Sequence, residues 1–567
     1  MKYEILPGLK LSAILGASKL SYEAFKSVGA VWNNGTPDFD RNFASVVYRS
    51  SGDRLLNFLA DYNKKINNKH IFNALLGAEY GEKNYNDIEA AGYNFPNPDL
   101  NFNLLQSSTV PTPTRTSRFK SNSNSFFGRI NYNFDDKYLA QFNFRVDGST
   151  AFGKNYKYGY FPSASFGWKI NKENFMKGFS NLSNLKLRLS YGEAGNNNIP
   201  NGLTDLTYTY DTYGGVTYLK LSKNYKENPD LKWETTTTSN LGIDLGYKNL
   251  TATLDVYLKK SRDVLLTKND NIINGFTKKI VNQGKVENKG VELTLGYTFY
   301  NLFGSKMNYQ PQINFSYNRS KVTDLAGDKV VPEDTDVYIN RNFKGATMLR
   351  EAGQQLYSFF LYHFDGVWQE NELATAGIYG AKPGDPKIRD VNNDGKLDKQ
   401  DKYHAGTPDA PITVGYANNF YYKNFEFKAF LQGVFGNKLY NQTRMMLENP
   451  MLSPFGNLST VVLDRWTPTN PSNTVDSKIS QVRQEFIESD KYLDNASFLR
   501  LKEVNIIYHW KMKPELQIRE LTFGLGITNV FTITPYKGLN PEVWHFDNQY
   551  STNPYTRTFT ISLNVNF

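Results

Sequence analysis

The chain has 567 residues, of which 40% are hydrophobic and 15% aromatic, with a net charge of +10 and no cysteine. The lack of cysteine excludes disulfides and thiolate metal sites, and no apolar run approaches the roughly 18 residues of a membrane helix. Lysine and arginine are scattered along the chain rather than clustered, which argues against a nucleic-acid partner.

Segments of alternating polarity recur along the whole chain. An extended strand places successive side chains on opposite faces, so each such segment has one apolar and one polar face. Sixteen of them are predicted to be strands, with alternating positions at 9–17, 56–62, 72–80, 126–134, 138–146, 164–170, 185–191, 241–247, 250–258, 291–299, 309–317, 412–420, 425–431, 504–508, 521–527 and 559–567.

The connections between these segments alternate in length. Short turns are expected at 63–69, 135–137, 248–249, 301–306 and 423–424, and long loops at approximately 81–124, 192–230, 259–288, 319–410 and 440–490. Short turns on one side and long loops on the other are typical of outer-membrane β-barrels. To keep this alternation, the aromatic stretches 208–221 and 356–368 are assigned to loops.

The polar faces of the predicted strands carry charged residues such as Arg188, Asp244 and Asp255. Charges at every second position are costly against lipid and tolerated toward a wet lumen. A soluble β-sandwich is the alternative, but its inner faces must pair across a dry core, and sixteen two-faced strands are hard to place there. We therefore predict an all-β fold for residues 1–567, a transmembrane antiparallel β-barrel of about 16 strands.

Residues 390–401, D-V-N-N-D-G-K-L-D-K-Q-D, have the spacing of an EF-hand-type calcium loop. Gly395 permits the sharp turn, and Asp401 stands where a glutamate is usual. The alternative is a metal-free Asn/Asp/Gly turn. We predict a structural Ca²⁺ at this loop. Its ligands would be the side-chain oxygens of Asp390, Asn392, Asp394, Asp398 and Asp401 and the backbone carbonyl of Lys396.

A catalytic site is not expected. The sequence contains no nucleophile elbow, P-loop or dinucleotide fingerprint. Its five histidines lie in separate segments, without metalloprotease spacing, at His70, His363, His404, His509 and His545.

Six stretches resemble the SusC-like (SusC/RagA) TonB-dependent transporters of Bacteroidota outer membranes. They are N-P-D-L-K-W-E-T (228–235), G-K-V-E-N-K-G-V-E-L (284–293), G-D-P-K-I-R-D (384–390), A-S-F-L-R-L-K-E-V (496–504), T-N-V-F (528–531) and Y-K-G-L-N-P-E-V (536–543). The closing strand, which ends on Phe567, resembles the signal that the barrel-assembly machinery recognises in its clients.

The resemblance implies a 22-stranded barrel with an N-terminal plug, a TonB box and a SusD-like surface lipoprotein as a lid. It implies import of oligosaccharides or peptides across the outer membrane, driven by TonB, ExbB and ExbD. Because about 16 strands and no plug or TonB box are found, the chain resembles the C-terminal barrel portion, and we expect it to be the later part of a longer chain.

Two other functions remain open, a 16-stranded passive porin and a surface adhesion or scaffolding protein. Substrate-binding residues are not identified. Loop aromatics that could stack on sugars are better explained as loop packing, namely Tyr208, Tyr210, Tyr213, Tyr218, Phe359 and Tyr362.

Overall fold

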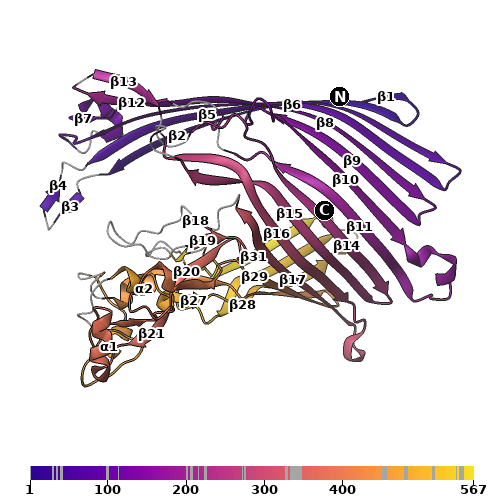
Figure 1. Ribbon diagram of the computed structural model, residues 1–567. Helices are drawn as coiled ribbons and strands as arrows, with labels where there is room; N and C mark the ends of the chain where they lie inside the picture. Colours follow the sequence, from indigo (N-terminus) through magenta and orange to yellow (C-terminus); the bar gives the residue numbers. More distant parts are fainter. Residues whose placement is uncertain are drawn as a thin grey trace. The chain divides into compact units, whose positions relative to one another are not determined.

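The computed structural model consists largely of antiparallel strands (Figure 1). It describes residues 2–28, 31–33, 36–38, 42–97, 101–112, 114–199, 202–204, 208–214, 216–221, 226–270, 273, 276–325, 330–332, 348–449, 452, 456–477, 483–513, 517–543, 546–547 and 554–567. Within these residues, no helix has the length and apolar character needed to cross a membrane. Two compact units are present, one of residues 1–168, 190–237 and 262–282, the other of 169–189, 238–261 and 283–567.

The first unit is built on long strands that pair with their neighbours in chain order. They are β1 (Lys2–Leu6), β2 (Leu9–Val28), β5 (Phe43–Ile66), β6 (His70–Tyr93), β8 (Arg115–Phe134), β9 (Tyr138–Ser149) and β10 (Tyr158–Lys169). The small elements of this unit are β3 (Val31–Asn33), β4 (Thr36–Asp38), η2 (Asn101–Ser107), β7 (Val110–Pro111) and the hairpin β12 (Tyr208–Tyr213) with β13 (Val216–Leu221).

The second unit also pairs its long strands in chain order. They are β17 (Met307–Leu325), β24 (Ile412–Tyr422), β25 (Phe425–Phe435), β28 (Phe498–Lys511), β29 (Glu520–Ile533) and β31 (Thr558–Asn566). Five strands have residues in both units: β10, of which only Lys169 belongs to the second, and β11 (Leu182–Asn196), β14 (Glu234–Tyr247), β15 (Leu250–Asn269) and β16 (Lys278–Tyr297). Short 3-10 turns complete the connections at η3 (Ile170–Lys172), η4 (Asn174–Met176) and η6 (Leu302–Gly304).

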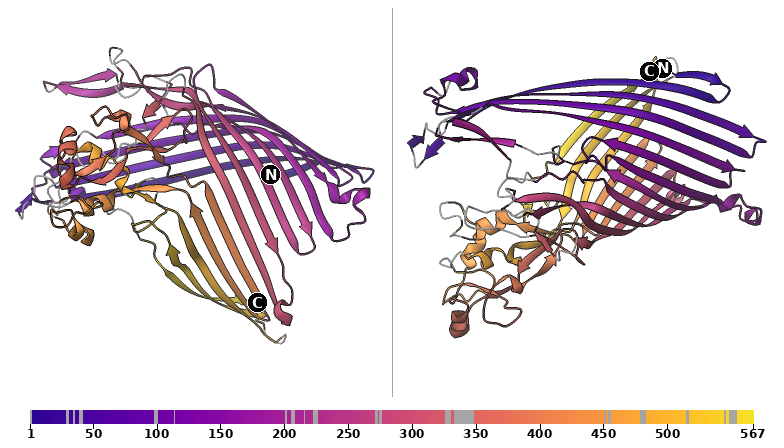
Figure 2. Two further views of the ribbon diagram at one scale, coloured as in Figure 1. Left: turned by 60° about the horizontal axis from the view of Figure 1, so that its bottom comes forward. Right: turned by 45° about the horizontal axis from the view of Figure 1, so that its top comes forward.

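Two long connections of the second unit fold together into what we call the loop module, residues 348–410 and 436–497 (Figures 1 and 2). Its strands and helices are β19 (Met348–Glu351), β20 (Ser358–Tyr362), β21 (Phe364–Val367), η7 (Glu370–Glu372), α1 (Leu373–Ile378), β22 (Pro386–Ile388), η8 (Lys399–Asp401), β23 (Lys402–Gly406), β26 (Lys438–Asn441), α2 (Gln442–Glu448), η9 (Thr460–Asp464), α3 (Gln484–Ile487), η10 (Asp490–Tyr492) and β27 (Leu493–Asn495). Two short strands outside it, β18 (Val330–Pro332) and β30 (Phe546–Asp547), pair with β19 and β26. The module has its own buried core of Met348, Phe359, Leu361, Ala405, Tyr440, Met445, Ile487 and Tyr492.

The strand prediction is confirmed. In the described part of the chain, sixteen strands have nine or more residues, and each overlaps one predicted segment; only 164–170, 291–299 and 559–567 run one or two residues past the end of their strand. Their apolar faces have no covering layer: Phe58 is 56% and Leu76 67% exposed, although both are large and hydrophobic. Faces of this kind suit lipid contact, and they contradict a sandwich with a dry interior.

The short turns are confirmed as well. The three-residue turns between β5 and β6 and between β8 and β9 have φ of +49° and +53° at Asn67 and Asn68, and +54° and +52° at Asp135 and Asp136. Asparagine and aspartate tolerate this left-handed region better than most residues, and two such residues in sequence make the hairpin turn that matches strand twist.

Two predicted loops were too wide. Strand β6 continues to Tyr93 and β8 begins at Arg115, so much of 81–124 is strand, and β15 and β16 likewise extend into 259–288. The error has a physical reason: above the lipid both faces of a strand meet water, so the alternation of polarity is lost while the backbone pairing continues. The aromatic stretches 208–221 and 356–368 lie outside the long strands, in a separate hairpin and in the loop module.

Candidate functional site

The polar faces of neighbouring strands carry a matched charge cluster. Arg188 on β11 donates from Nε to Asp244 Oδ2 at 2.9 Å and from Nη1 to Asp255 Oδ1 at 2.9 Å. Asn240 donates to the same Asp255 oxygen at 2.9 Å. Alternation places these four side chains opposite the apolar positions of β11, β14 and β15. This surface can solvate polar cargo, and the sequence placed three of the four residues on it.

Buried ion pairs stabilise the loop module, and one of them, Lys402–Glu488, joins its two connections. Lys402 Nζ lies 2.7 Å from Glu488 Oε2, and Arg444 Nη1 lies 2.5 Å from Asp494 Oδ1. Lys491 pairs with Asp476 in the same way. Paired charges tolerate burial where single ones do not. The module therefore behaves as one packed body.

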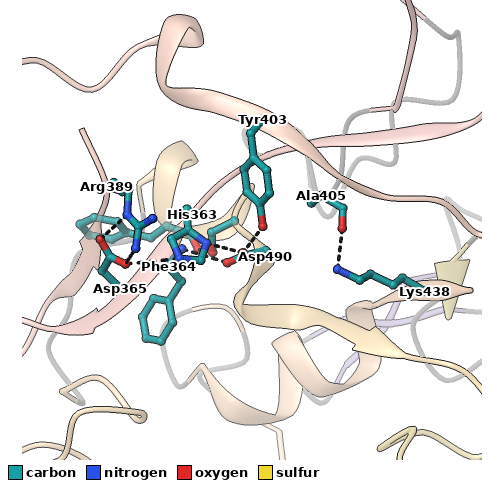
Figure 3. Close-up of polar contacts among 10 residues, drawn as sticks. His363, Phe364, Asp365, Arg389, Tyr403, Ala405, Lys438 and Asp490 are labelled. Carbon is teal, nitrogen blue, oxygen red and sulfur yellow. Dashed lines mark hydrogen bonds and ion pairs between the residues drawn. The ribbon is translucent and has the colours of Figure 1, made fainter. Parts of the chain in front are cut away.

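Asp490 ties three segments of the module together (Figure 3). Its Oδ2 lies 2.7 Å from His363 Nδ1 and accepts the hydroxyl of Tyr403 at 2.6 Å, and its Oδ1 accepts the N–H of Phe364 at 2.9 Å. Burial, together with the hydrogen bond to Asp490, raises the pKa of Tyr403, so this hydroxyl stays neutral and donates.

Arg389 adds a fourth contact beside this cluster. It holds Asp365 with two hydrogen bonds, from Nε at 2.9 Å and from Nη2 at 2.5 Å (Figure 3). A bidentate guanidinium-carboxylate pair is directional as well as charged, so it fixes β21 against the residue that precedes the calcium-type loop.

This pair makes the loop module sensitive to acid. The hydrogen bond from Arg389 lowers the pKa of the Asp365 carboxyl. A carboxyl whose pKa is lowered by folding adds stability above its unfolded pKa of about 3.9, and that stability is lost as the pH falls through the folded value. We expect hydrogen exchange in β21 and β22 to accelerate below about pH 3.9. Arg389→Gln should flatten this dependence, and an unchanged profile in that variant would contradict the assignment.

The loop 390–401 has the turn that its spacing predicts. Asp390 accepts the N–H of Asn393 at 2.7 Å and of Gly395 at 2.9 Å, and the hydroxyl of Tyr379 at 3.1 Å. Asn393 and Gly395 have φ of +58° and +78°, so glycine occupies a position where a side chain would be strained. Partial desolvation raises the pKa of Asp390, but its hydrogen bonds outweigh this and lower it.

The remaining carboxylates of the loop also point at its own backbone. Asp394 accepts the N–H of Lys396 at 2.9 Å, and the buried Asp401 accepts those of Val391 at 2.9 Å and Asp398 at 2.8 Å. Asp401 thus closes the loop onto its start.

Metal binding at this loop depends on more than carboxylates. Across the described ranges, no three His, Asp or Glu side chains are placed to hold a metal ion by themselves. A calcium ion would need the amide oxygen of Asn392 and the carbonyl oxygen of Lys396 in addition. Calcium accepts such mixed oxygen donors, so the donor chemistry fits it.

One contact has the composition of a hydrolase triad. Ser358 Oγ lies 2.8 Å from His404 Nδ1, and His404 Nε2 lies 2.5 Å from Glu351 Oε2. A nucleophile must be reachable by substrate, and Ser358 is only 4% exposed. We therefore assign this contact to packing of the loop module. Of the other histidines, His70 and His509 lie on strands, and His545 is outside the described residues.

The candidate sugar-stacking aromatics divide into two groups. Phe359 and Tyr362 are buried in the loop module, as packing requires, whereas Tyr208, Tyr213 and Tyr218 are exposed on the hairpin β12–β13. The side chain of Tyr210 is outside the described residues.

Sequence reasoning missed the contact between Arg500 and Glu542. Nη1 of Arg500 lies 2.5 Å from Glu542 Oε2, and Nε donates to Thr532 at 2.8 Å. The two charged residues belong to the stretches 496–504 and 536–543, which the resemblance had singled out. The sequence marked both stretches, yet no local spacing indicates that they meet across 42 residues.

Comparison with known proteins agrees with this geometry. Residues 9–341 match the family model described as TonB dependent receptor-like, β-barrel. TonB-dependent receptor P26 of Formosa agariphila is 30% identical over 526 residues, covering 89% of this chain and 52% of that protein. TonB-dependent receptor SusC of Bacteroides thetaiotaomicron is 28% identical over 596 residues, covering 100% of this chain and 55% of that protein.

A solved structure of the RagAB peptide importer in the "open-open" state is 25% identical with a TM-score of 0.84, covering 100% of this chain and 60% of that chain. The chain spans about half the length of the curated relatives it matches. It therefore belongs to the TonB-dependent receptor β-barrel family and is a SusC-like β-barrel of the outer membrane.

Proposed function

We propose that this chain is the C-terminal barrel portion of a transporter that imports oligosaccharides or peptides across the outer membrane, with a SusD-like lipoprotein as its partner. The energy would come from TonB, ExbB and ExbD, acting through a region N-terminal to this chain in the longer protein. Nutrient import is the activity that the SusC-like family supports, and the substrate class and the partners are our proposal.

The observation that carries this proposal is the pairing of a lipid-facing barrel wall with a packed loop module. A passive pore needs only the wall, whereas a protein that receives cargo from a lid needs a shaped, rigid surface at its mouth. The buried ion pairs Lys402–Glu488 and Arg444–Asp494 supply that rigidity.

Uptake in cells tests the proposal. In a strain lacking the full-length parent gene, we expect restored uptake of labelled oligosaccharide or peptide when the gene is returned, abolished uptake when the proton-motive force is collapsed, and co-purification of a SusD-like lipoprotein. Uptake that persists without the proton-motive force favours the porin. Loss of surface attachment without any change in uptake favours the adhesion protein.

We further propose that residues 390–401 bind a structural Ca²⁺. Asp390, Asn392, Asp394, Asp398 and Asp401 would supply side-chain oxygens, and Lys396 its carbonyl. The ion would offset the repulsion of four carboxylates in one short loop and hold that loop against β21 and β22.

Asp394→Ala is expected to weaken calcium binding by about tenfold or more and to loosen the loop without unfolding the barrel. Lys399→Ala, a change at an exposed position of the same loop, is the matched control. Elemental analysis should find calcium in the purified protein and in the control, and chelation should accelerate hydrogen exchange within 390–401. Purified wild-type protein without calcium would refute the site.

A further inference from the structure

The outward side of β2, β5, β6 and β8 changes from apolar to charged at one level. Register aligns Ala13, Phe58, Ala78 and Phe126 in one outward row, and Leu15, Leu56, Tyr80 and Asn124 in the next. The following row is Ala17, Arg54, Glu82 and Asn122, and the one after it Lys19, Gly52, Asn84 and Lys120. A single mixed row thus separates a fully apolar row from the two rows that carry the charges.

The level of this change matches a bilayer surface. On β5 the outward positions between Lys64 and Arg54 are all apolar or aromatic, and they occupy the segment 55–63. A tilted strand crosses the hydrocarbon in about 9–11 residues, so Lys64 and Arg54 lie at its two boundaries. Arg54 is on the side of the long connections, which in outer-membrane barrels is the outside of the cell.

Two of the charges at this boundary are paired with one partly buried carboxylate, that of Glu82. Lys120 Nζ lies 2.7 Å and Arg54 Nη1 3.7 Å from Glu82, whose side chain is 10% exposed. Arg54 and Lys120 expose 74% and 55% of their side chains. Tyr80 and Asn84 donate to the same carboxylate at 3.3 and 2.9 Å. Lys19 lies in the same row as Lys120, with Gly52 and Asn84 between them, so three cations share this outward side with one anion.

A hollow of about 400 Å³ adjoins these charges, and Lys19, Gly52, Arg54 and Asn84 contribute to its lining. It exists because glycine stands between the long side chains. A Cβ placed on Gly52 would meet a single atom, the carbonyl oxygen of Ser18 at 3.8 Å. The basic patch therefore has an open recess beside it rather than a flat surface.

We propose that Lys19, Arg54 and Lys120 bind the phosphate groups of a phosphorylated glycolipid in the outer leaflet, with its sugar headgroup in the hollow and its acyl chains on the apolar rows. Basic clusters at a membrane surface attract anionic headgroups, and Arg and Lys are the common phosphate donors. Charge complementarity and the level of the patch favour a lipid over a soluble anion.

The second unit carries the same arrangement independently. Glu287 on β16 lies 2.8 Å from Lys289 Nζ and 3.9 Å from Lys260 Nζ, and Lys321 is its register partner on β17. Lys260 and Lys289 alternate in phase with the apolar positions Val256 and Val291, so they share the outward face. One carboxylate among basic residues on the outward face is thus found in each unit.

The test uses the full-length parent protein in detergent and native mass spectrometry with diphosphorylated lipid A as the probe. Arg54→Gln/Lys120→Gln is expected to lower lipid affinity about 20-fold. Gly52→Leu keeps every charge and fills the hollow, and it should also weaken binding. Lys64→Gln removes an outward charge from the other boundary of the same strand and should leave binding unchanged. Heat-modifiable gel mobility checks that each variant is folded.

Three results would overturn the proposal. They are equal affinity of the folded double variant and the wild type, equal binding of fully dephosphorylated lipid A, and displacement of the lipid by excess inorganic phosphate alone. The first result would show that Arg54 and Lys120 do not bind the lipid. The second would show that the phosphate groups are not recognised. The third would show that the site binds free phosphate and not a lipid.

Discussion

Arg500→Met is expected to destabilise the barrel by about 3 kcal/mol, the lower end of the 3–5 kcal/mol range for breaking a buried ion pair. The side chain of Arg500 is 1% exposed, and its removal leaves the carboxylate of Glu542 without its guanidinium partner. Glu542 is 30% exposed, so water relieves part of that penalty. The substitution also removes the stacking of the guanidinium over Tyr555, at 3.8 Å from the ring centroid.

Thermal unfolding followed by gel mobility and by β-sheet circular dichroism measures this loss. Lys502→Met is the matched control, since Lys502 is exposed on the same strand and such changes usually stay within about 0.5 kcal/mol. Arg500→Met/Glu542→Gln should be no less stable than Arg500→Met alone. If the stability lost by the double variant instead equals the sum of the losses measured for the two single variants, the two residues are not coupled.

Phe359→Ala is expected to cost about 3–5 kcal/mol within the loop module. Phe359 is fully buried in the core that contains Tyr440, Met445 and Ile487, so truncation leaves a cavity that the packed surroundings fill only in part. Because this ring is inaccessible, the loss should appear as local unfolding and not as weaker contact with cargo.

Hydrogen exchange and limited proteolysis of the full-length protein distinguish these outcomes. We expect faster exchange and new cleavage within 348–410, while the long strands keep their protection. Phe360→Ala is the control, because the neighbouring ring is only partly buried and contacts His404 at 5.3 Å between ring centroids. Equal effects of the two substitutions would contradict the assignment of Phe359 to the core.

The strands were predictable where lipid and water act on opposite faces. Around Phe58 and Leu76 one face is entirely apolar or aromatic and the other carries Asn57, Asp61, Asn73 and Glu79, and there prediction and structure agree. Next to Arg54 and Glu82 the same strands continue through 49–53 and 83–87, where most residues on both faces are polar or glycine, and there the alternation that predicts a strand is interrupted. The alternation of polar and apolar residues therefore depends on what surrounds a strand and not on its hydrogen bonding to neighbouring strands. For this reason the predicted boundaries of the loops 81–124 and 259–288 were wrong.

The candidate site was predictable only where its residues are close in sequence. The turn of 390–401 follows from glycine at its sixth position and from side chains that bond to the loop's own backbone. The contact between His363 and Asp490 joins residues 127 positions apart, and no local sequence pattern predicts it. Such pairs are set by the packing of two connections against one another, which requires the folded chain.

The length of β5 and β6 has a consequence for access from outside the cell. Each strand has 24 residues, and 11 of those in β5, from Phe43 to Asp53, lie beyond Arg54. At about 3.3 Å per residue and a tilt of about 40°, they form a collar roughly 28 Å high. Under the import function proposed above, a protein that delivers cargo would have to reach a rim that stands that far above the level of Arg54.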